Sequence, residues 1–442
     1  MVNRGRWPSI WVWGVVLSVL LVGCAGLRPP RGKPPRTTTT SVLTTTTTAA
    51  PPSTTTTSVA PSTTTTTASS TTTTTSPIPE PGGAISRVTN GAGGPIGGDS
   101  WGSAISADGR YVAFGSSATD LVPDDTNFDD DIFVWDRPTS STERITDGND
   151  TSHSPAISAD GGYVAFSSWA SDLTPDDLND KSDLFVWNAT TGTTTRITDG
   201  NGDSYGAAIS ADGRHIAFES AASNLVPGDT SDTNDKSDVF VWDATTATTT
   251  RITDGANASF FPAMSADGRY ITFYAFASNQ VPDDTNGWWD VFVWDATTGT
   301  TTRITDGDEN SLDPTISADG RYITFWSAAS NLVPNDTNGP GLFRWDGTNG
   351  AIVRVSSGGE APLISADGRY VIFNHAGDSF QDVFVWDATT ATATNITQGN
   401  GRSYRGSVSA NGGLITFSSE AFNLVPGDAN GSVDVFLWDR ND

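Results

Sequence analysis

The sequence predicts an all-β protein in which residues 84–442 form a seven-bladed β-propeller, closed by an N-terminal strand that completes the last blade. Three observations predict this fold. The tetrapeptide Ser-Ala-Asp-Gly, once as Ser-Ala-Asn-Gly, occurs seven times between Ser106 and Ser409. An aromatic run that ends in tryptophan also occurs seven times. No long segment carries apolar residues at helical spacing, so we expect very little helix.

Each repeat predicts four short strands. In the second repeat we expect them at residues 154–158, 163–167, 184–187 and 193–198. Asp160-Gly161 supplies the first turn, because Asp-Gly between apolar runs is a strong hairpin signal. Four strands per unit, repeated radially, are typical of a propeller blade. The serines that begin the tetrapeptides are Ser106, Ser158, Ser210, Ser265, Ser317, Ser365 and Ser409, and the tryptophans are Trp135, Trp187, Trp242, Trp294, Trp345, Trp386 and Trp438.

A permutation by one strand favours a closed ring over an open array of β-units. Fourth-strand motifs follow only six of the seven tryptophans, beginning with Arg144-Ile145-Thr146. The seventh copy precedes the first blade, as Arg87-Val88-Thr89 within residues 85–91. Pairing of this segment with the last blade would close the ring and remove both free sheet edges. The repeated tryptophans end strands buried on both faces, so we expect them to pack in the core rather than to stack on a ligand.

The stretch Ser106–Phe114, Ser-Ala-Asp-Gly-Arg-Tyr-Val-Ala-Phe, resembles the WD40-like (PD40) repeat of TolB-type propeller proteins. The usual form of that repeat is Ser-Pro-Asp-Gly followed by an apolar strand and Phe, and the similarity covers residues 84–442. The chain departs from it in having Ala where Pro is commoner and a longer loop between the second and third strands. TolB-type proteins also have six blades and a separate N-terminal domain. The resemblance implies the propeller fold and only weakly a role in the cell envelope.

The first 23 residues predict a secretory signal peptide. Arg4 and Arg6 precede an apolar run from about Ile10 to Gly23, which is shorter than the roughly 20 residues of a spanning helix. The run ends in Leu-Val-Gly-Cys-Ala, and this resembles the lipobox of bacterial lipoproteins. The resemblance implies that Cys24 is lipidated and that the protein is extracytoplasmic, anchored to the bacterial membrane in the cell envelope or at the cell surface. The alternative is a plain secreted protein with an incidental cysteine.

The segment 24–83 that follows the signal peptide consists almost entirely of Thr, Pro, Ser and Ala. Such a composition cannot bury enough apolar surface to offset the entropy of ordering, so we expect a disordered stalk. Serine and threonine tracts with proline are also typical of O-glycosylated stalks, and an unmodified linker is the alternative.

Charge and cysteine content narrow the classes of partner. The whole chain has a net charge of −27, and residues 80–442 hold 18 basic and all 51 acidic residues, a net charge of −33. This balance argues against nucleic acid and anionic membrane surfaces as partners, and it favours cationic partners or divalent metal. The single cysteine excludes an intrachain disulfide, a zinc–thiolate site and an iron–sulfur cluster.

The long loops between second and third strands share the pattern Asp-x-Asn-x-x-x-Asp. Carboxylate and amide oxygens at alternate loop positions can converge on calcium, which takes six to eight oxygen ligands. The alternative is that these are turn residues, since Asp and Asn bond their own backbone. The fifth repeat has Leu342 at the third position, and the sixth repeat loses the pattern. The candidate ligands are Asp125, Asn127, Asp131, Asp177, Asn179, Asp183, Asp232, Asn234, Asp238, Asp284, Asn286, Asp290, Asp428, Asn430 and Asp434.

Trp288 and Trp289 lie within one of these acidic loops and are candidates for a binding site, with core packing as the alternative.

Two Gly-x-Ser-x-Gly stretches, at residues 98–102 and 202–206, match the sequence of the hydrolase nucleophile elbow but not its structural context, because that elbow needs a strand-to-helix turn in an α/β sheet. The three histidines occupy unrelated repeat positions and predict no ligand motif. We therefore interpret them as polar surface or strand residues.

The sequence as a whole predicts a cell-envelope lipoprotein whose propeller binds or scaffolds a protein or a glycan, with calcium as the one candidate cofactor. The face with the long acidic loops is the leading candidate for the binding surface. We expect no enzymatic activity and no catalytic residues. The alternative is an extracytoplasmic hydrolase or lyase with a carboxylate site in the propeller channel, and a third hypothesis is a purely structural module. A channel with converging acidic and basic groups would favour the enzyme.

Overall fold

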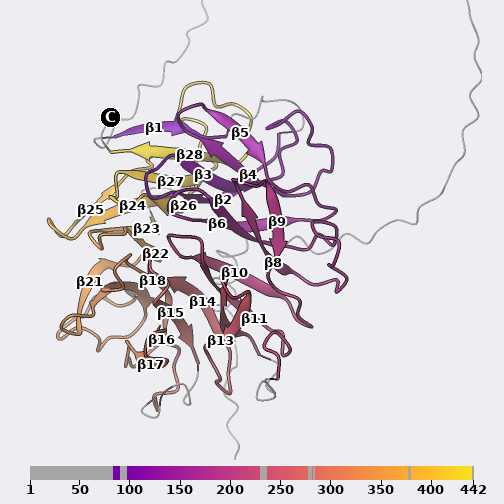
Figure 1. Cartoon of the computed structure of the whole chain (residues 1–442). Coiled ribbons are helices and arrows are strands. Elements are labelled where there is room, and N and C mark those ends of the chain that lie inside the picture. The colour runs from indigo at the N-terminus through magenta and orange to yellow at the C-terminus, as the bar shows by residue number, and fades with distance from the viewer. Residues whose placement is uncertain are drawn as a thin grey trace, which may run out of the picture. The chain divides into compact units, whose positions relative to one another are not determined.

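The computed structural model describes residues 83–89, 97–228, 236–276, 281, 284–376 and 380–440. These residues form seven four-stranded antiparallel sheets arranged around one axis, as Figure 1 shows. The prediction of an all-β, seven-bladed propeller is confirmed, and no helix occurs in the described ranges. None of these residues therefore belongs to a helix that could cross a membrane. The predicted signal peptide, Cys24 and nearly all of the predicted stalk lie outside the described residues.

Six blades take their four strands in sequence order, and the seventh combines three late strands with the first strand of the chain. Blade 1 is β2 Ser100–Ile105, β3 Tyr111–Ser116, β4 Asp131–Asp136 and β5 Ser141–Arg144; blade 2 is β6 Ser152–Ile157, β7 Tyr163–Ser168, β8 Asp183–Asn188 and β9 Thr193–Arg196; blade 3 is β10 Ser204–Ile209, β11 His215–Ser220, β12 Asp238–Asp243 and β13 Thr248–Arg251; blade 4 is β14 Ser259–Met264, β15 Tyr270–Ala275, β16 Asp290–Asp295 and β17 Thr300–Arg303. Blade 5 is β18 Ser311–Ile316, β19 Tyr322–Ser327, β20 Gly341–Asp346 and β21 Ala351–Ser357; blade 6 is β22 Glu360–Ile364, β23 Tyr370–Ala376, β24 Gln381–Asp387 and β25 Thr392–Asn395; blade 7 is β26 Ser403–Val408, β27 Leu414–Ser419, β28 Asp434–Asp439 and β1 Ala84–Arg87.

The predicted closure of the ring is confirmed by the register of β1. This strand pairs with β28, and Arg87 lies opposite Phe436. In blade 1 the fourth strand has the same register, because Arg144 lies opposite Phe133. The strand β1 therefore takes the place of a fourth strand, and Figure 1 shows it beside β28.

The apolar core lies between neighbouring blades. Residues of the second and third strands of blade 1 pack against blade 7 on one face and against blade 2 on the other. Phe114 and Phe133 stack with ring centroids 5.7 Å apart, and an equivalent pair recurs in every blade. The repeated tryptophans are buried or half-buried in this core, as predicted. Third strands buried on both faces account for the nearly continuous apolar runs in the sequence.

The Ser-Ala-Asp-Gly turns hold neighbouring blades together. In blade 1 the Ser106 hydroxyl donates to Asp108 at 2.7 Å, and Gly109 adopts a φ of 75° that favours glycine. The N–H of Ala107 donates to the carbonyl of Ala159 in blade 2 at 2.9 Å. The same backbone bond links five further pairs of neighbouring blades in the described residues. This face of the propeller is therefore tied together by its tight turns, and the long loops lie on the opposite face.

Candidate functional site

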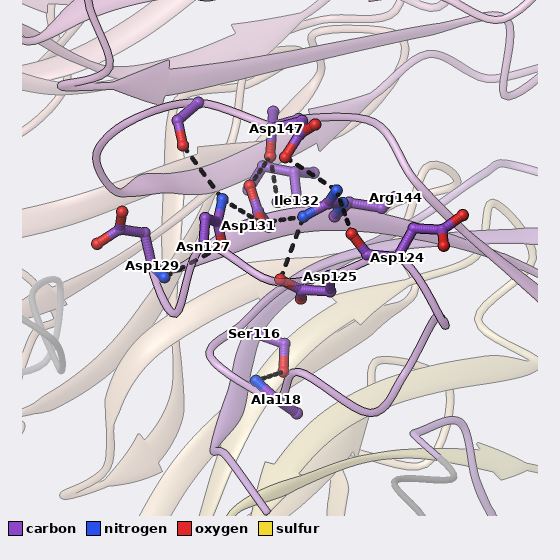
Figure 2. A network of polar contacts seen from close by, with 12 residues as sticks. Ser116, Ala118, Asp124, Asp125, Asn127, Asp129, Asp131, Ile132, Arg144 and Asp147 are labelled. Carbon is purple, nitrogen blue, oxygen red and sulfur yellow. Dashed lines mark hydrogen bonds and ion pairs between the residues drawn. The ribbon is translucent and has the colours of Figure 1, made fainter. Parts of the chain in front are cut away.

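The long loops bring their predicted carboxylates together around an arginine of the fourth strand. In blade 1, Nη1 of Arg144 lies 3.1 Å from Asp125 and 3.3 Å from Asp131, as Figure 2 shows. The Asn127 amide donates to Asp131 at 3.1 Å. Both carboxylate side chains are almost fully buried, with 2% and 0% of their surfaces exposed. A buried guanidinium thus supplies the positive charge that these acids require.

The same arrangement recurs in each of the other three loops for which all three pattern residues are described. The arginine there is Arg196, Arg303 or Arg87, and it pairs with both carboxylates of its loop. In blade 3, Arg251 pairs with Asp238 at 3.3 Å; Asp232 and Asn234 lie outside the described residues. Burial raises the pKa of the inner aspartates, to about 6 for Asp183 and Asp290.

The predicted calcium ligands therefore already surround a positive charge, which is the guanidinium group of an arginine of the same chain. Among the described residues, no group of three or more His, Cys, Asp or Glu side chains is placed to hold a metal ion. The oxygen-rich pattern is explained by guanidinium binding and by turn hydrogen bonds such as Asp129 N–H to Asn127 Oδ1 at 3.2 Å. Calcium binding by these loops stays a prediction.

Trp288 and Trp289 are half-buried rather than exposed. The Trp289 ring lies 5.9 Å from Phe260, 5.4 Å from Tyr274 and 5.5 Å from Phe276, measured between centroids. The backbone N–H of Trp288 donates to Asn286 Oδ1 at 2.9 Å. Their role in binding stays a prediction, but Trp289 is part of a larger aromatic surface. We call Phe260, Phe261, Tyr274, Phe276 and Trp289 the aromatic wall.

The serines of the two Gly-x-Ser-x-Gly stretches have a structural role. Ser100 and Ser204 are buried first residues of inner strands, and their hydroxyls bond serine hydroxyls of the second strands at 2.8 and 2.9 Å. Equivalent serine pairs occur in blades 2, 5 and 7. This repetition accounts for the motif without a nucleophile.

A second set of residues, around the propeller axis, breaks the symmetry of the repeats. The first strand of each blade contacts the first strands of both neighbours, so the seven strands form an inner ring. Each carries a break in register, a β-bulge that follows the first or the second residue of a pair near the start of the strand. Other strands repeat nearly identical sequences, such as Thr-Thr-Thr-Arg, but no two blades have the same pair at this place. The seven pairs are Trp101-Gly102, His153-Ser154, Tyr205-Gly206, Phe260-Phe261, Leu312-Asp313, Glu360-Ala361 and Tyr404-Arg405.

The second residue of the pair has a left-handed backbone in six blades, with φ between 50° and 70°. Blades 1 and 3 have glycine there, but Ser154, Phe261, Asp313 and Ala361 are not glycine. A non-glycine residue in this conformation costs about 1–2 kcal/mol. Strain of this kind persists where the surrounding structure enforces it, and it is concentrated at functional sites.

Charged side chains from non-adjacent blades approach one another at the axis. Asp313 of blade 5 and Arg405 of blade 7 interact electrostatically, and Glu360 of blade 6 interacts with both. No ion pair within 4 Å joins these three among the described residues, and each of Asp313 and Arg405 has a buried polar atom, Oδ1 and Nε, without a hydrogen-bond partner. We call Glu219, Asp313, Glu360 and Arg405 the axial cluster.

The environment of the axial cluster shifts its proton affinities. Burial raises the pKa of Asp313 to about 6, against the opposing effect of Arg405, and burial raises the pKa of Glu219 to about 7. Burial also lowers the pKa of His153 to about 4, so this histidine is neutral at pH 7. All of these side chains remain partly exposed to solvent. The axis therefore holds acids that are partly protonated near neutral pH, beside a neutral imidazole and a guanidinium.

Sequence reasoning set His153 aside and did not single out Asp313, Glu360 or Arg405. The sequence did contain an indication of this site, as a difference between otherwise similar repeats. Five and four residues before each anchor serine, a chain that otherwise repeats itself carries seven unlike pairs. The convergence of Glu219 with this set could not be predicted, because it comes from a second strand and joins the next blade through a hydrogen bond from the Phe261 N–H.

Comparison with known proteins shows the fold. No protein-family model matches the chain, and no curated protein matches it in sequence. Among solved structures, an oligogalacturonate lyase in complex with manganese aligns with a TM-score of 0.55 and 12% identity, over 80% of this chain and 92% of that one. An acylaminoacyl peptidase from Pyrococcus horikoshii aligns with a TM-score of 0.54 and 14% identity, over 77% of this chain and 51% of that one.

The expectation that the protein is not an enzyme is wrong as a conclusion from its architecture, because both of these structurally similar proteins are enzymes. The TolB-type resemblance of the repeats is accompanied by a weaker likeness to TolB from Acinetobacter baumannii. The TM-score is 0.41 at 17% identity, over 75% of this chain and 81% of that one, and nothing about role follows from it. The chain thus shares the β-propeller fold with these proteins, at identities that show the fold alone.

Proposed function

We propose that this protein is an exported, lipid-anchored propeller that binds a carbohydrate at the axial cluster. The observation that carries the proposal is the set of unlike residue pairs at the axis of an otherwise repetitive ring. Aromatic rings pack against the apolar C–H faces of sugars, and carboxylate, amide and guanidinium groups bond their hydroxyls. The axis offers both kinds of group side by side.

The polar groups suit a ligand that both donates and accepts hydrogen bonds. Asp313 and Arg405 interact but do not touch, so a hydroxyl or a water molecule between them would satisfy both. Asn374 accepts the backbone N–H of Arg405 at 2.8 Å, and the Gln381 amide donates to Glu360, so neighbouring amides fix the Arg405 backbone and the Glu360 carboxyl group. On other sides lie the aromatic wall and the stacked rings of His153 and Tyr205, 6.0 Å apart.

Isothermal titration of the purified full chain with cellohexaose, xylohexaose and chitohexaose tests the proposal. We expect saturable binding of at least one sugar. Asp313→Gly should weaken that binding at least tenfold and leave the melting temperature unchanged or higher, because glycine adopts a φ of 52° without strain. Ala361→Gly is the matched control: it relieves the same strain, and it should bind like the wild type. Absence of binding to all three sugars, or normal binding by Asp313→Gly, contradicts the proposal.

A second candidate is acid–base chemistry on the bound sugar. One observation favours it: Asp313 and Glu219 have pKa values of about 6 and about 7, so protonated and ionised carboxyl groups coexist at the axis. In glycoside hydrolysis a protonated carboxyl donates to the leaving oxygen, and a carboxylate takes a proton from the attacking water. Release of reducing ends from a bound oligosaccharide, lost in Asp313→Asn with binding retained, would establish it. Binding without turnover leaves a binding protein.

A further inference from the structure

We propose that Glu219 and the aromatic wall form a subsite for a positively charged ammonium group. The inference deepens the proposed function, because it assigns a free amino group to the carbohydrate. It rests on that function only for the sugar part of the ligand. Glu219 lies in β11 of blade 3, and the wall lies in blade 4.

The hydrogen bond that Glu219 makes within the protein does not require its negative charge. Its carboxyl group accepts a hydrogen bond from the backbone N–H of Phe261 in the next blade, at 2.8 Å. In blade 6 the residue at the same place, the fifth of the second strand, is Asn374, which accepts the N–H of Arg405 at 2.8 Å in the same way. A neutral side chain therefore accepts the corresponding backbone N–H of the next blade. The carboxylate at Glu219 requires another explanation.

Glu219 also differs from the buried acids of the long loops. Those carboxylates each face an arginine of their own blade, as Asp125 faces Arg144 at 3.1 Å. No ion pair between Glu219 and a basic side chain occurs among the described residues. Its cross-strand neighbour is Tyr205, and the bulge residue beside that tyrosine is Gly206, which leaves the carboxyl group uncovered by a side chain there. A cation from outside the chain would supply the missing charge.

The aromatic wall lies beside this carboxyl group, since Glu219 accepts the backbone N–H of Phe261 and acts electrostatically on Tyr274. Phe261 stacks on Tyr274 with centroids 5.8 Å apart and planes inclined by 18°, and 41% of Phe261 is exposed. Phe276 is 37% exposed and contacts Trp289. Phe261 also holds the strained φ of 52° at a position where glycine serves in two other blades. Ring faces attract ammonium groups through their quadrupole, and the attraction strengthens where water is excluded.

The remaining charges of the region agree with a cationic ligand. Tyr274 lies within the electrostatic influence of both Glu219 and Asp313. Three acids of the axial cluster face one arginine, so the axis is acidic when they are ionised. An amino sugar fits this arrangement: its ammonium group lies between Glu219 and the ring faces, and its hydroxyls reach Asp313, Glu360 and Arg405.

Titration with tetramethylammonium, which carries no sugar, tests the subsite by itself. We expect a saturable change in tryptophan fluorescence, since Trp289 belongs to the wall. Glu219→Gln keeps the acceptor oxygen for the Phe261 N–H and removes the charge, and it should weaken binding at least tenfold at an unchanged melting temperature. Glu143→Gln removes the same charge from an exposed glutamate of the outer strand β5 and should bind like the wild type. Failure of tetramethylammonium to bind, equal binding by Glu219→Gln, or an equal loss in Glu143→Gln overturns the inference.

A comparison of glucosamine trimer with its N-acetylated form separates the two proposals. We expect the free amine to bind at least tenfold more tightly. Equal binding of the two trimers overturns the ammonium subsite and leaves the carbohydrate proposal standing. Binding of tetramethylammonium without binding of either trimer contradicts the carbohydrate proposal and leaves the subsite standing.

Discussion

Arg144 lies with its Nη1 atom 3.1 Å from Oδ1 of Asp125, and only 10% and 2% of the two side chains are exposed. The same nitrogen lies 3.3 Å from Asp131. The guanidinium thus lies between carboxylate oxygens that the sequence pattern predicted as calcium ligands. Three further blades repeat the relationship, so these buried clusters are a property of the fold.

Replacement of Arg144 by methionine should destabilise the propeller by about 3–5 kcal/mol, because it leaves two buried carboxylates without a counter-charge. Urea unfolding followed by tryptophan fluorescence measures the change. Arg110→Met is the control, since Arg110 pairs with Asp136 at 3.1 Å on the surface with 46% of its side chain exposed. That variant should lose much less stability, because exposed ion pairs are screened by water and contribute little. Similar losses in the two variants would contradict this interpretation of the buried pair.

Calcium should distinguish the wild type from Arg144→Met. In the wild type the guanidinium already occupies the oxygen cluster, so we expect the melting temperature to differ little between millimolar calcium and EDTA at matched ionic strength. In the variant the vacated oxygens should accept calcium, and a ligand at a hundredfold excess over its Kd adds about 2.7 kcal/mol. A calcium-specific rise of several degrees in the wild type would instead make the loops metal sites, as the sequence pattern suggested.

Stability should rise as the pH falls from 7 to about 5. Burial raises the pKa of Asp183, Asp290 and Asp313 to about 6 and that of Glu219 to about 7 in the folded state. Carboxyl groups in the unfolded chain titrate near 4. These four groups therefore bind more protons in the folded state between these values, which outweighs the opposite effect of the single His153, whose pKa burial lowers to about 4. Urea midpoints at pH 5 and 7 measure the effect, and a higher midpoint at pH 7 would contradict it.

Below about pH 4 the stability of the folded state should instead fall as the pH falls. The hydrogen bond from Arg269 holds the pKa of Asp295 at about 2, below its unfolded value. Equivalent arginine pairs on the short-turn face involve Asp136, Asp243, Asp346 and Asp387, all with lowered pKa values. The unfolded state binds more protons in this range, so acid should unfold the protein. Urea midpoints that keep rising down to pH 2.5 would show that these pairs contribute nothing.

Removal of β1 should open the ring. A chain that starts at residue 98 leaves β28 as an unpaired edge, whereas a chain that starts at residue 83 keeps the strand. We expect the shorter chain to melt at a lower temperature and to self-associate, because exposed edge strands pair with other chains. Light scattering after size-exclusion chromatography measures the association. Equal melting and a monomeric state in both chains would show that the pairing of β1 is dispensable.

The fold could be predicted from the sequence because the repeats are nearly identical in the residues that build the blades. The anchor serines, the aromatic runs that end in tryptophan and the displaced motif at Arg87 predicted seven blades and their closure. The loop aspartates were harder to interpret, since a pattern of oxygens does not show which cation it faces. Arg144 and Asp125 are 19 positions apart, and only strand pairing brings them together.

The axial cluster could be predicted only in part. Asp313 and Arg405 lie four residues before their anchor serines and Glu360 lies five before its own, and comparison of the repeats with one another reveals all three as exceptions. Their mutual approach depends on the curvature of the ring, which no local pattern encodes. Asp and Arg are also common residues of this chain, so their types alone did not distinguish these three from surface charges.

The pairing of β1 with β28 also constrains how the chain can fold. The two strands are about 350 residues apart, so the last blade cannot be completed until nearly the whole propeller has been synthesised. Blades 1 to 6 consist of neighbouring segments and can form early, but ring closure must overcome the entropy of a very long loop. Until then β28 and the inner face of blade 1 stay uncovered, and such edges invite aggregation. The slow step of folding should therefore be ring closure, and blade 7 the last part to become protected from hydrogen exchange.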